Sequence, residues 1–230
     1  MAEKMITLYK YLSREHIEEI LTSQRLMLSN GENFNDPFDV TVTDRKSGSC
    51  NKIKGLHILC LTNSHQAKLM WSHYGDAHKG FCLTVKIPKK WVYPICYSSE
   101  RVFENSNLDQ IINNSKKIAK KNVNLDYTQL SQRKKEALVK DKKWMYEKEY
   151  RVIFDQDDEK SMKSDSKYLV SENGKWYLKV KIRNIYLGVN VDDIQLEARI
   201  RELCETANIE VTRMELSSDH YSINAARRRT

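Results

Sequence analysis

Two glutamates separated by a single residue, Glu147 and Glu149, lie in the segment KKWMYEKEYRVIF at residues 142–154. If this segment is a β-strand, its side chains alternate between the two faces, and both glutamates then share one face with Arg151. Two neighbouring carboxylates repel each other unless a cation or a substrate lies between them. The pattern therefore indicates either an ordinary solvated sheet edge or part of a functional site.

A second unusual stretch is MWSHYGDAHKGF at residues 70–81. It gathers two imidazoles and two large aromatic rings within eight residues: Trp71, His73, Tyr74 and His78. The histidines are five residues apart, which does not match the i, i+4 spacing of a helical metal site. Such a cluster suits a flat ring, a nucleobase or nicotinamide, bound by stacking and hydrogen bonds. The alternative is that the two large rings are core residues and both histidines are exposed.

The loop FNDPFD at residues 34–39 places Asn35 and Asp36 directly before a proline. Side chains of this type bond to nearby backbone amides and hold tight turns, and a residue before proline is extended. The loop is therefore either a well-made turn or a loop whose Asn and Asp face a pocket, as loops on a rigid scaffold often do.

Several established chemistries have no local signature in this chain. GxSxG, HExxH, Walker and GxGxxG motifs are absent, and the five cysteines are far apart without the spacing of a zinc site. We therefore expect no bound metal. A metal-dependent nuclease remains an alternative, because Asp36, Asp39, Glu147 and Glu149 are carboxylates of the kind that bind Mg²⁺.

The elements that must position these residues follow from hydrophobic patterning. Strands are expected at 6–13, 25–29, 56–62, 79–87, 149–154, 167–170, 175–181, 182–189 and 209–216, and helices at 13–24, 64–76 and 192–208. Ser13 is the expected cap of the first helix, and Ile194, Ala198, Leu203 and Cys204 the apolar face of the last. This order predicts an α+β fold with a mixed or antiparallel, split sheet and flanking helices. We expect a single domain over 1–230, with a basic helical insertion, a hairpin of two helices, at about 104–143.

Charge is unevenly distributed along the chain. The net charge is +8, and residues 115–143 hold ten Lys or Arg against three Asp or Glu. This segment indicates either a solvated lysine-rich helix face or a surface that attracts nucleic acid or anionic membrane. No run of eighteen apolar residues exists, and the N-terminus lacks the apolar core of a signal peptide. We therefore expect a cytoplasmic protein without a membrane span.

Four motifs together resemble an uncharacterised bacterial family: LYKY at residues 8–11, NDPFD at 35–39, MWxxYxxxHxGxC at 70–82 and WxYExEYR at 144–151. The resemblance covers most of the chain and is weakest between residues 99 and 140. It implies membership of that family but no activity.

A weaker resemblance is to ADP-ribosyltransferases of the split-sheet type, which cleave NAD. Their three elements are similar to Lys10 or Tyr11 in the first strand, LTNS at 61–64 and the ExE pattern at 147–149. Lys10 stands where these enzymes have Arg or His, and LTNS only loosely resembles their Ser-Thr-Ser motif.

The resemblance implies that Glu149 stabilises the ribose and Glu147 orients the acceptor. The residues expected at the cofactor are Lys10, Tyr11, Asn35, Asp36, Trp71, His73, Tyr74, His78 and Arg151.

The working hypothesis is an ADP-ribosyltransferase-like enzyme that cleaves the nicotinamide–ribose bond of NAD and modifies a protein or nucleic-acid acceptor, in bacterial toxin or phage-defence biology. The alternatives are a nucleic-acid-binding protein or metal-dependent nuclease of a defence system, and a non-catalytic ligand-sensing module. The sequence indicates no oligomeric state.

Overall fold

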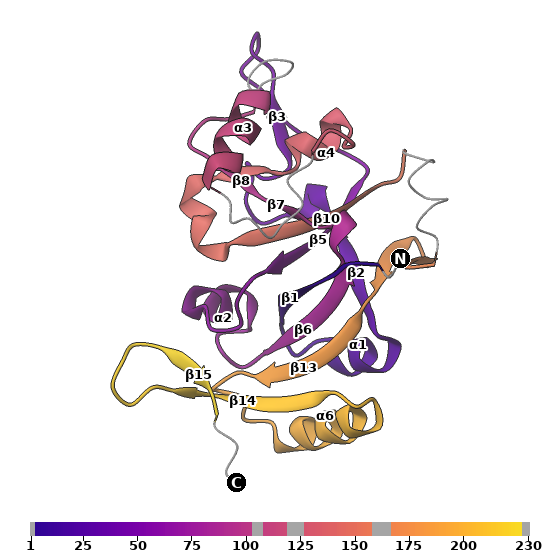
Figure 1. Ribbon diagram of the computed structural model, residues 1–230, viewed down its shortest axis with the longest axis vertical. Helices are drawn as coiled ribbons and strands as arrows, with labels where there is room; N and C mark the ends of the chain where they lie inside the picture. Colours follow the sequence, from indigo (N-terminus) through magenta and orange to yellow (C-terminus); the bar gives the residue numbers. More distant parts are fainter. Residues whose placement is uncertain (1–2, 103–107, 119–126, 158–166, 227–230) are drawn as a thin grey trace. The chain divides into compact units, whose positions relative to one another are not determined.

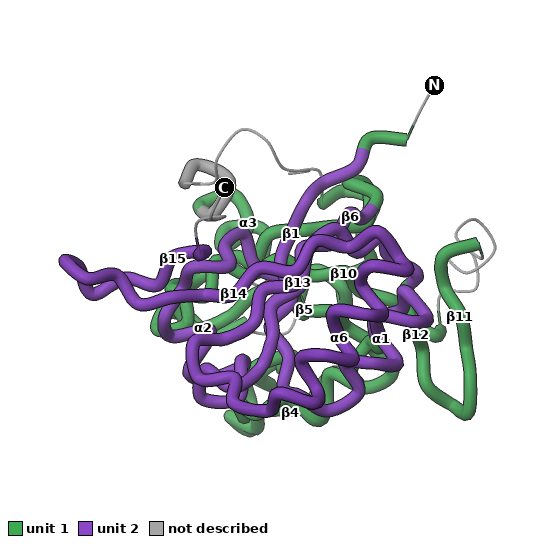
Figure 2. The backbone as a smooth tube through the Cα atoms, turned by 90° about the horizontal axis from the view of Figure 1, so that it is seen from below, with its two compact units in different colours: residues 1–4, 27–60, 88–178 green, residues 5–26, 61–87, 179–230 purple. Residues whose placement is uncertain are grey.

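The computed structural model describes residues 3–102, 108–118, 127–157 and 167–226. The chain forms two compact units, each assembled from three separate stretches (Figure 2). Unit 1 comprises Met1–Lys4, Met27–Cys60 and Pro88–Leu178, and unit 2 comprises Met5–Leu26, Leu61–Ile87 and Lys179–Thr230.

Unit 1 is built from short strands around two apolar clusters (Figure 1). Its strands are β2 (Arg25–Asn30), β3 (Thr41–Thr43), β4 (Cys50–Lys52), β5 (Leu56–Thr62), β7 (Tyr93–Pro94), β8 (Cys96–Ser98), β9 (Val139–Asp141), β10 (Glu149–Asp155), β11 (Leu169–Glu172) and β12 (Lys175–Lys179), of which β2, β5 and β12 continue into unit 2. Its helical segments are η1 (Gly31–Asn33), η2 (Lys89–Trp91), α3 (Leu108–Ile118), α4 (Gln132–Glu136) and η3 (Lys142–Glu147).

Pairing in unit 1 is mixed. β2 and β5 are antiparallel, as are β10 and β7, whereas β8 and β9 are parallel. One cluster packs Ile111 and Ile112 of α3 against Leu138 and Val139. The other places Leu56 and Ile58 of β5 on Val40. The strand that carries Glu149 and Arg151 therefore belongs to a packed sheet.

Unit 2 is a mixed sheet with helices. Its elements are β1 (Met5–Leu12), α1 (Ile17–Ser23), α2 (Lys68–Tyr74), β6 (Phe81–Pro88), β13 (Lys181–Leu187), α6 (Ile194–Thr206), β14 (Glu210–Leu216) and β15 (Ile223–Ala225). The strand order is β1-β6-β13-β14-β15. β6 and β13 are antiparallel, β13 and β14 parallel, and β14 and β15 antiparallel.

The sequence of β6 explains its central place. Its residues FCLTVKIP are almost all buried, as expected of a strand covered on both faces. α6 is capped by Asp193, whose carboxylate accepts a hydrogen bond from the Leu196 amide, as a good N-cap does. Leu196, Ile200 and Cys204, four residues apart, form its buried stripe.

The predicted α+β class with a mixed sheet is confirmed, but three details differ. α1 begins after His16, which has a left-handed φ of 61°, so Ser13 is not its cap. Ile194 is 83% exposed and Ala198 is exposed, because the buried stripe of α6 runs through Leu196 instead.

The expected helical hairpin at 104–143 contains α3 and the short α4, and its residues 104–107 and 119–126 lie outside the described residues. Beyond α4 the chain forms β9 and η3, because Val139 pairs with Cys96 of β8 and is buried. Lys134 and Lys140 are also buried, so these two lysines do not add to a basic surface.

No helix within the described ranges has the length and apolar character needed to cross a membrane.

Candidate functional site

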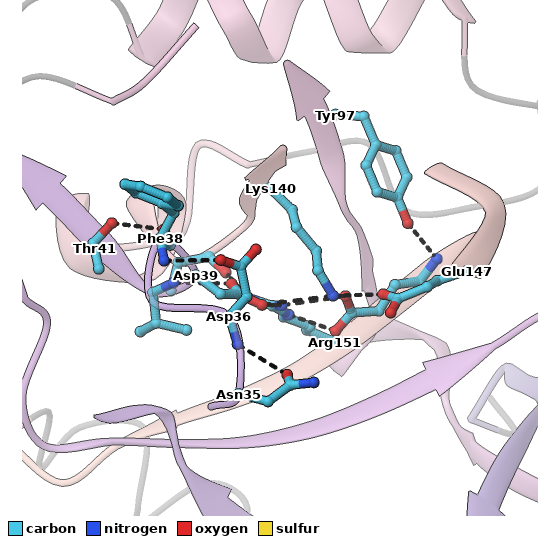
Figure 3. A network of polar contacts seen from close by, with 12 residues as sticks. Asn35, Asp36, Phe38, Asp39, Thr41, Tyr97, Lys140, Glu147 and Arg151 are labelled. Carbon is cyan, nitrogen blue, oxygen red and sulfur yellow. Dashed lines mark hydrogen bonds and ion pairs between the residues drawn. The ribbon is translucent and has the colours of Figure 1, made fainter. Parts of the chain in front are cut away.

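Five charged side chains meet in the interior of unit 1: Asp39, Lys140, Glu147, Glu149 and Arg151. Figure 3 labels all of them except Glu149. Their exposed fractions are 3%, 8%, 2%, 5% and 0%, respectively. We call these five residues the buried charge cluster. Charged residues are almost never buried to this degree unless they are paired. The cluster is therefore the strongest candidate site in unit 1.

The two glutamates reach the cluster from different backbone elements. Glu147 ends the 3₁₀ turn η3, and Glu149 begins strand β10. Lys148 between them has a left-handed backbone with φ 46°, which ends the turn and starts the strand. The strand therefore begins at Glu149, as the expected strand at 149–154 does, and Glu147 lies outside it. The turn still brings both carboxylates to one point.

That point is the ammonium group of Lys140. Its Nζ lies 2.5 Å from Glu147 Oε2, 2.9 Å from Glu149 Oε2 and 3.6 Å from Asp39 Oδ2. The indole ring of Trp144 lies 5.1 Å from the same nitrogen, measured to the ring centroid. The cation that a pair of neighbouring carboxylates requires is thus a side chain of this protein.

Arg151 fixes the opposite side of Glu149. Its Nε donates to Glu149 Oε1 at 2.7 Å, and its two terminal nitrogens donate to the two Asp39 oxygens at 2.9 and 2.7 Å. Nη1 also donates to the carbonyl of Ala137 at 2.7 Å, and the ring of Phe34 lies 5.3 Å from the guanidinium carbon. This two-pronged pairing orients the carboxylates as well as neutralising them. As placed, Arg151 positions Glu149.

Electrostatics keep Glu149 ionised. Burial by itself would raise the pKa of Glu149, but the charges of Arg151 and Lys140 outweigh it and hold this pKa well below its ordinary value. Burial would likewise lower the pKa of Lys140, but the surrounding carboxylates, Glu149 foremost, raise it. With all five groups ionised, three carboxylates and two cations leave one net negative charge in the cluster.

Tyr97 closes the cluster at the start of β10. Its hydroxyl accepts a hydrogen bond from the backbone amide of Glu149 at 2.8 Å. Burial raises the pKa of Tyr97, so the hydroxyl stays neutral. The first residue of the strand is therefore held by its backbone as well as by its carboxylate.

The FNDPFD loop delivers Asp39 to this cluster. The Asn35 side chain accepts from the Asp36 amide, and Asp36 Oδ1 accepts from the Phe38 amide at 2.9 Å. Lys52 Nζ donates to the carbonyls of Asp36 and Asp39. Asn35 is exposed and Asp36 is buried. Both residues build a turn, and the carboxylate that the turn presents to Arg151 belongs to Asp39.

In unit 2, Tyr11 and Trp71 are packed together. Their rings meet edge to face with centroids 5.1 Å apart, and both side chains are buried. The Tyr11 hydroxyl donates to the carbonyl of Ser64, and the Trp71 indole donates to that of His65. Lys10 is half-buried in β1. In this arrangement the two aromatic rings support α2 and the loop before it.

The chain after α2 makes a strained turn. Asp76, Ala77 and His78 have successive φ values of 50°, 48° and 68°. A left-handed conformation costs about 1–2 kcal/mol for each residue other than glycine, and such outliers gather at functional sites. The Arg14 side chain pairs with Asp76 at 3.2 Å.

Close backbone packing holds the turn in place. A Cβ atom added to Gly188 would lie 2.1 Å from the carbonyl oxygen of His78, and the Asn190 amide donates to that oxygen at 3.0 Å. The rings of this stretch predict a binding site for a flat ring, whereas its distinguishing feature in the structure is the left-handed backbone. His73 is exposed and meets the half-buried Tyr74 edge to face, at 6.3 Å between centroids.

The residues predicted for one site thus fall into two groups. Asn35, Asp36, Glu147, Glu149 and Arg151 belong to unit 1, and Lys10, Tyr11, Trp71, His73, Tyr74 and His78 belong to unit 2. In unit 1 the two glutamates and Arg151 are in one network, and Asp36 and Asn35 form the adjoining turn.

Sequence reasoning missed the role of Lys140. It stands among surface-type lysines in the sequence, and its only local signal is the apolar ALV before it. Within the described part of the chain, no group of three or more His, Cys, Asp or Glu side chains is arranged to hold a metal ion.

Comparison with known proteins identifies one family. Residues 70–152 match the family model described as "Protein of unknown function (DUF2971)". No curated protein and no solved structure matches the chain. The matched span includes the strained turn after α2 and, at its other end, Lys140, Glu147, Glu149 and Arg151. A DUF2971 domain, whose function is unknown, is therefore found at residues 70–152.

Proposed function

We propose that the protein uses NAD as an ADP-ribosyltransferase-like enzyme, with Glu149 as the carboxylate that stabilises the ribose cation. The observation that carries the proposal is the convergence of Glu147 and Glu149 on one cation, the Lys140 ammonium. A place that holds an ammonium between two carboxylates is suited to hold another positively charged group.

The chemistry requires such a place. Cleavage of the nicotinamide–ribose bond passes through an oxocarbenium-like state, as glycoside cleavage does. Nicotinamide leaves as a neutral molecule with the electron pair of the broken bond, and the positive charge remains on the ribose. Glu149, whose carboxylate stays paired with Arg151, stabilises that charge.

Glu147 serves the acceptor. The acceptor attacks the ribose carbon with an electron pair and loses a proton, which a carboxylate at hydrogen-bonding distance accepts. Glu147 and Glu149 share one ammonium, so a group bound in its place contacts both. The acceptor is a protein, a nucleic acid or, in hydrolysis, water.

Lys140 must move for this reaction. Its ammonium group occupies the place that the ribose takes, and it is held by a flexible four-carbon side chain. The bound substrate carries a positive charge on its nicotinamide ring, so it replaces the ammonium without leaving the two glutamates uncompensated. Arg151, which has no exposed surface, remains and keeps Glu149 oriented.

The test measures nicotinamide release from NAD by the purified chain and by Glu149→Gln. We expect release by the wild-type protein and a loss of at least about a hundredfold in the variant, the scale of removing one preorganised stabilising group. Glu202→Gln, on the exposed face of α6, is the surface control and keeps full turnover.

Because Glu149 is part of a buried network, a loss of activity must be separated from a loss of folding. Asp39→Asn breaks the same network at Arg151 but removes no group assigned to the reaction. At a temperature where circular dichroism shows both variants folded, we expect Asp39→Asn to retain turnover and Glu149→Gln to lack it. Equal turnover of wild type and Glu149→Gln, or no release by the wild type, contradicts the proposal.

A further inference from the structure

Unit 2 contains an open cavity of about 620 Å³ that has no part in the proposed reaction. Its wall consists of Lys68 at the start of α2, His78 of the strained turn, and residues 216–223, which run from the end of β14 to the start of β15. Figure 1 shows the hairpin that β14 and β15 form. Small-molecule sites in proteins usually occupy about 300–1,000 Å³. The cavity therefore has the size of a ligand site.

The hairpin carries an aromatic side chain, Tyr221, that is almost fully exposed. Tyr221 is 96% exposed and Leu216 is 72% exposed, both on the cavity wall. The Lys68 ammonium lies 5.8 Å from the centroid of the Tyr221 ring. A tyrosine at this exposure offers a face for stacking, and a cation beside it offers a place for an anionic group.

The cavity wall also carries a carboxylate and several hydroxyl groups. Asp219 accepts a hydrogen bond from the Ser217 hydroxyl at 2.6 Å and lies 3.2 Å from His220 Nδ1. Ser218 and Ser222 add two hydroxyls. A carboxylate beside hydroxyl groups is suited to the hydroxyls of a sugar, which it accepts as hydrogen-bond donors.

His78 is the fixed part of the wall. Its backbone is in the left-handed region, with the amide bonded to the Trp71 carbonyl and the carbonyl bonded to the Asn190 amide. Burial lowers the pKa of His78, so the imidazole is neutral near pH 7 and able both to donate and to accept. Its Nδ1 is buried without a hydrogen-bond partner among the described residues. A strained backbone and an unsatisfied ring nitrogen are both costs that packing alone does not explain.

We propose that this cavity binds a mononucleotide: Tyr221 stacks on the base, Asp219 accepts from the ribose hydroxyls, and Lys68 pairs with the phosphate. Three chemically different parts of one ligand class are thus matched by three side chains from the same wall. His78 bounds the cavity on the α2 side. The inference does not depend on the proposed NAD cleavage.

The test titrates AMP into the full chain by calorimetry. We expect saturable binding by the wild type, and a loss of about tenfold or more in Tyr221→Ala, since stacking of a base on an aromatic side chain is worth about 1–3 kcal/mol. Tyr221→Phe keeps the ring and is expected to bind like the wild type. Because Tyr221 is almost fully exposed, neither substitution removes buried area, so both variants are expected to fold.

Charge is tested with a matched pair of lysines. Lys68→Ala is expected to weaken AMP binding and to leave adenosine binding unchanged, because adenosine lacks the phosphate. Lys79→Ala, an exposed lysine outside the cavity wall, is expected to change neither.

Three outcomes overturn the inference: no saturation by AMP, equal affinity of wild type and Tyr221→Ala, or binding of a short single-stranded oligonucleotide but not of AMP. AMP binding is also measured on Glu149→Gln. Glu149→Gln is expected to bind AMP like the wild type. Binding of AMP by a wild-type protein that releases no nicotinamide refutes the proposed reaction and leaves the cavity site standing. Release of nicotinamide by a wild-type protein that does not bind AMP refutes the cavity site and leaves the proposed reaction standing.

Discussion

The buried charge cluster of unit 1 and the cavity wall of unit 2 place their polar groups in opposite environments. In the cluster, Lys140 and Arg151 are paired with carboxylates inside the protein, and the side chains are almost inaccessible. On the cavity wall, Tyr221 and Lys68 are exposed, and the buried polar atom is Nδ1 of the half-buried His78.

This difference in exposure sets different requirements for a ligand of the cluster and a ligand of the cavity. A ligand of the cluster has to replace an existing partner, the Lys140 ammonium, and therefore has to place a positively charged group between the carboxylates. A ligand of the cavity adds to groups that already face solvent, so it needs shape and complementary charge but displaces only water. The following predictions test whether the cluster is as closed, and the turn as strained, as this comparison requires.

The largest expected effect is on Arg151. Arg151→Met leaves Asp39 and Glu149 buried without their bidentate partner, and breaking a buried ion pair costs about 3–5 kcal/mol of unfolding free energy. Urea denaturation monitored by circular dichroism measures this value. Arg199→Met is the matched control, because Arg199 pairs with Glu18 on the exposed surface. Such pairs contribute about 0–1 kcal/mol. Equal losses in the two variants contradict a closed cluster.

The second effect is the pH dependence of the contribution that Glu149 makes to the free energy of unfolding. Its pKa in the folded state lies below the unfolded value of about 4.3, so the stabilisation is complete above that pH and is lost as the pH falls toward the folded pKa. At pH 7 we expect Glu149→Gln to be about 2–3 kcal/mol less stable than wild type.

That difference should shrink below about pH 4, because the unfolded wild-type carboxyl then binds a proton. Urea midpoints at pH 7, 5, 4 and 3 measure it. A difference that stays constant over this series argues that Glu149 contributes through packing and not through its charge.

The third effect concerns the backbone contact that holds the strained turn. Gly188→Ala places a methyl group 2.1 Å from the His78 carbonyl oxygen, a backbone atom that cannot move without disturbing the turn. We expect a loss of about 1–3 kcal/mol, as for other overpacked sites. Thermal unfolding with and without AMP measures both the loss of stability and any weakening of AMP binding in the cavity. A variant as stable as wild type would show that the turn is loosely packed.

The smallest effect is a gain. Ala77→Gly relieves the left-handed conformation at φ 48°, and we expect it to raise the unfolding free energy by up to about 1 kcal/mol. Ala207→Gly is the control, because Ala207 has φ −90° and is exposed at the end of α6. At this position we expect a small loss of unfolding free energy, because glycine adds conformational freedom to the unfolded chain. Equal changes at the two positions contradict strain in the turn.

Much of the fold could be predicted from local patterns. The apolar runs of β5 and β6 were expected close to where the structure has them. The helix before Gly75 ends where it was expected to end, but it begins at Lys68 and not at residue 64. α6 was expected, but its buried face was not, because Ile194 is the first residue of the helix and points away from the stripe of Leu196.

The site was less accessible to sequence reasoning because its contacts are long-range. The glutamates and Arg151 drew attention through their spacing, yet the left-handed Lys148 placed Glu147 off the strand. Asp39 lies 112 residues before Arg151, and no local pattern connects them. Lys140 lies in a lysine-rich segment, where a buried lysine looks like its exposed neighbours.

The most direct measurement is a crystal structure of the full chain with a hydrolysis-resistant NAD analogue. The account predicts the ribose between the Glu147 and Glu149 carboxylates, with the Lys140 ammonium turned out of the cluster and Arg151 still paired with Glu149. An analogue bound elsewhere, with Lys140 Nζ still 2.9 Å from Glu149, would contradict the claim that the cluster is a site for a substrate cation.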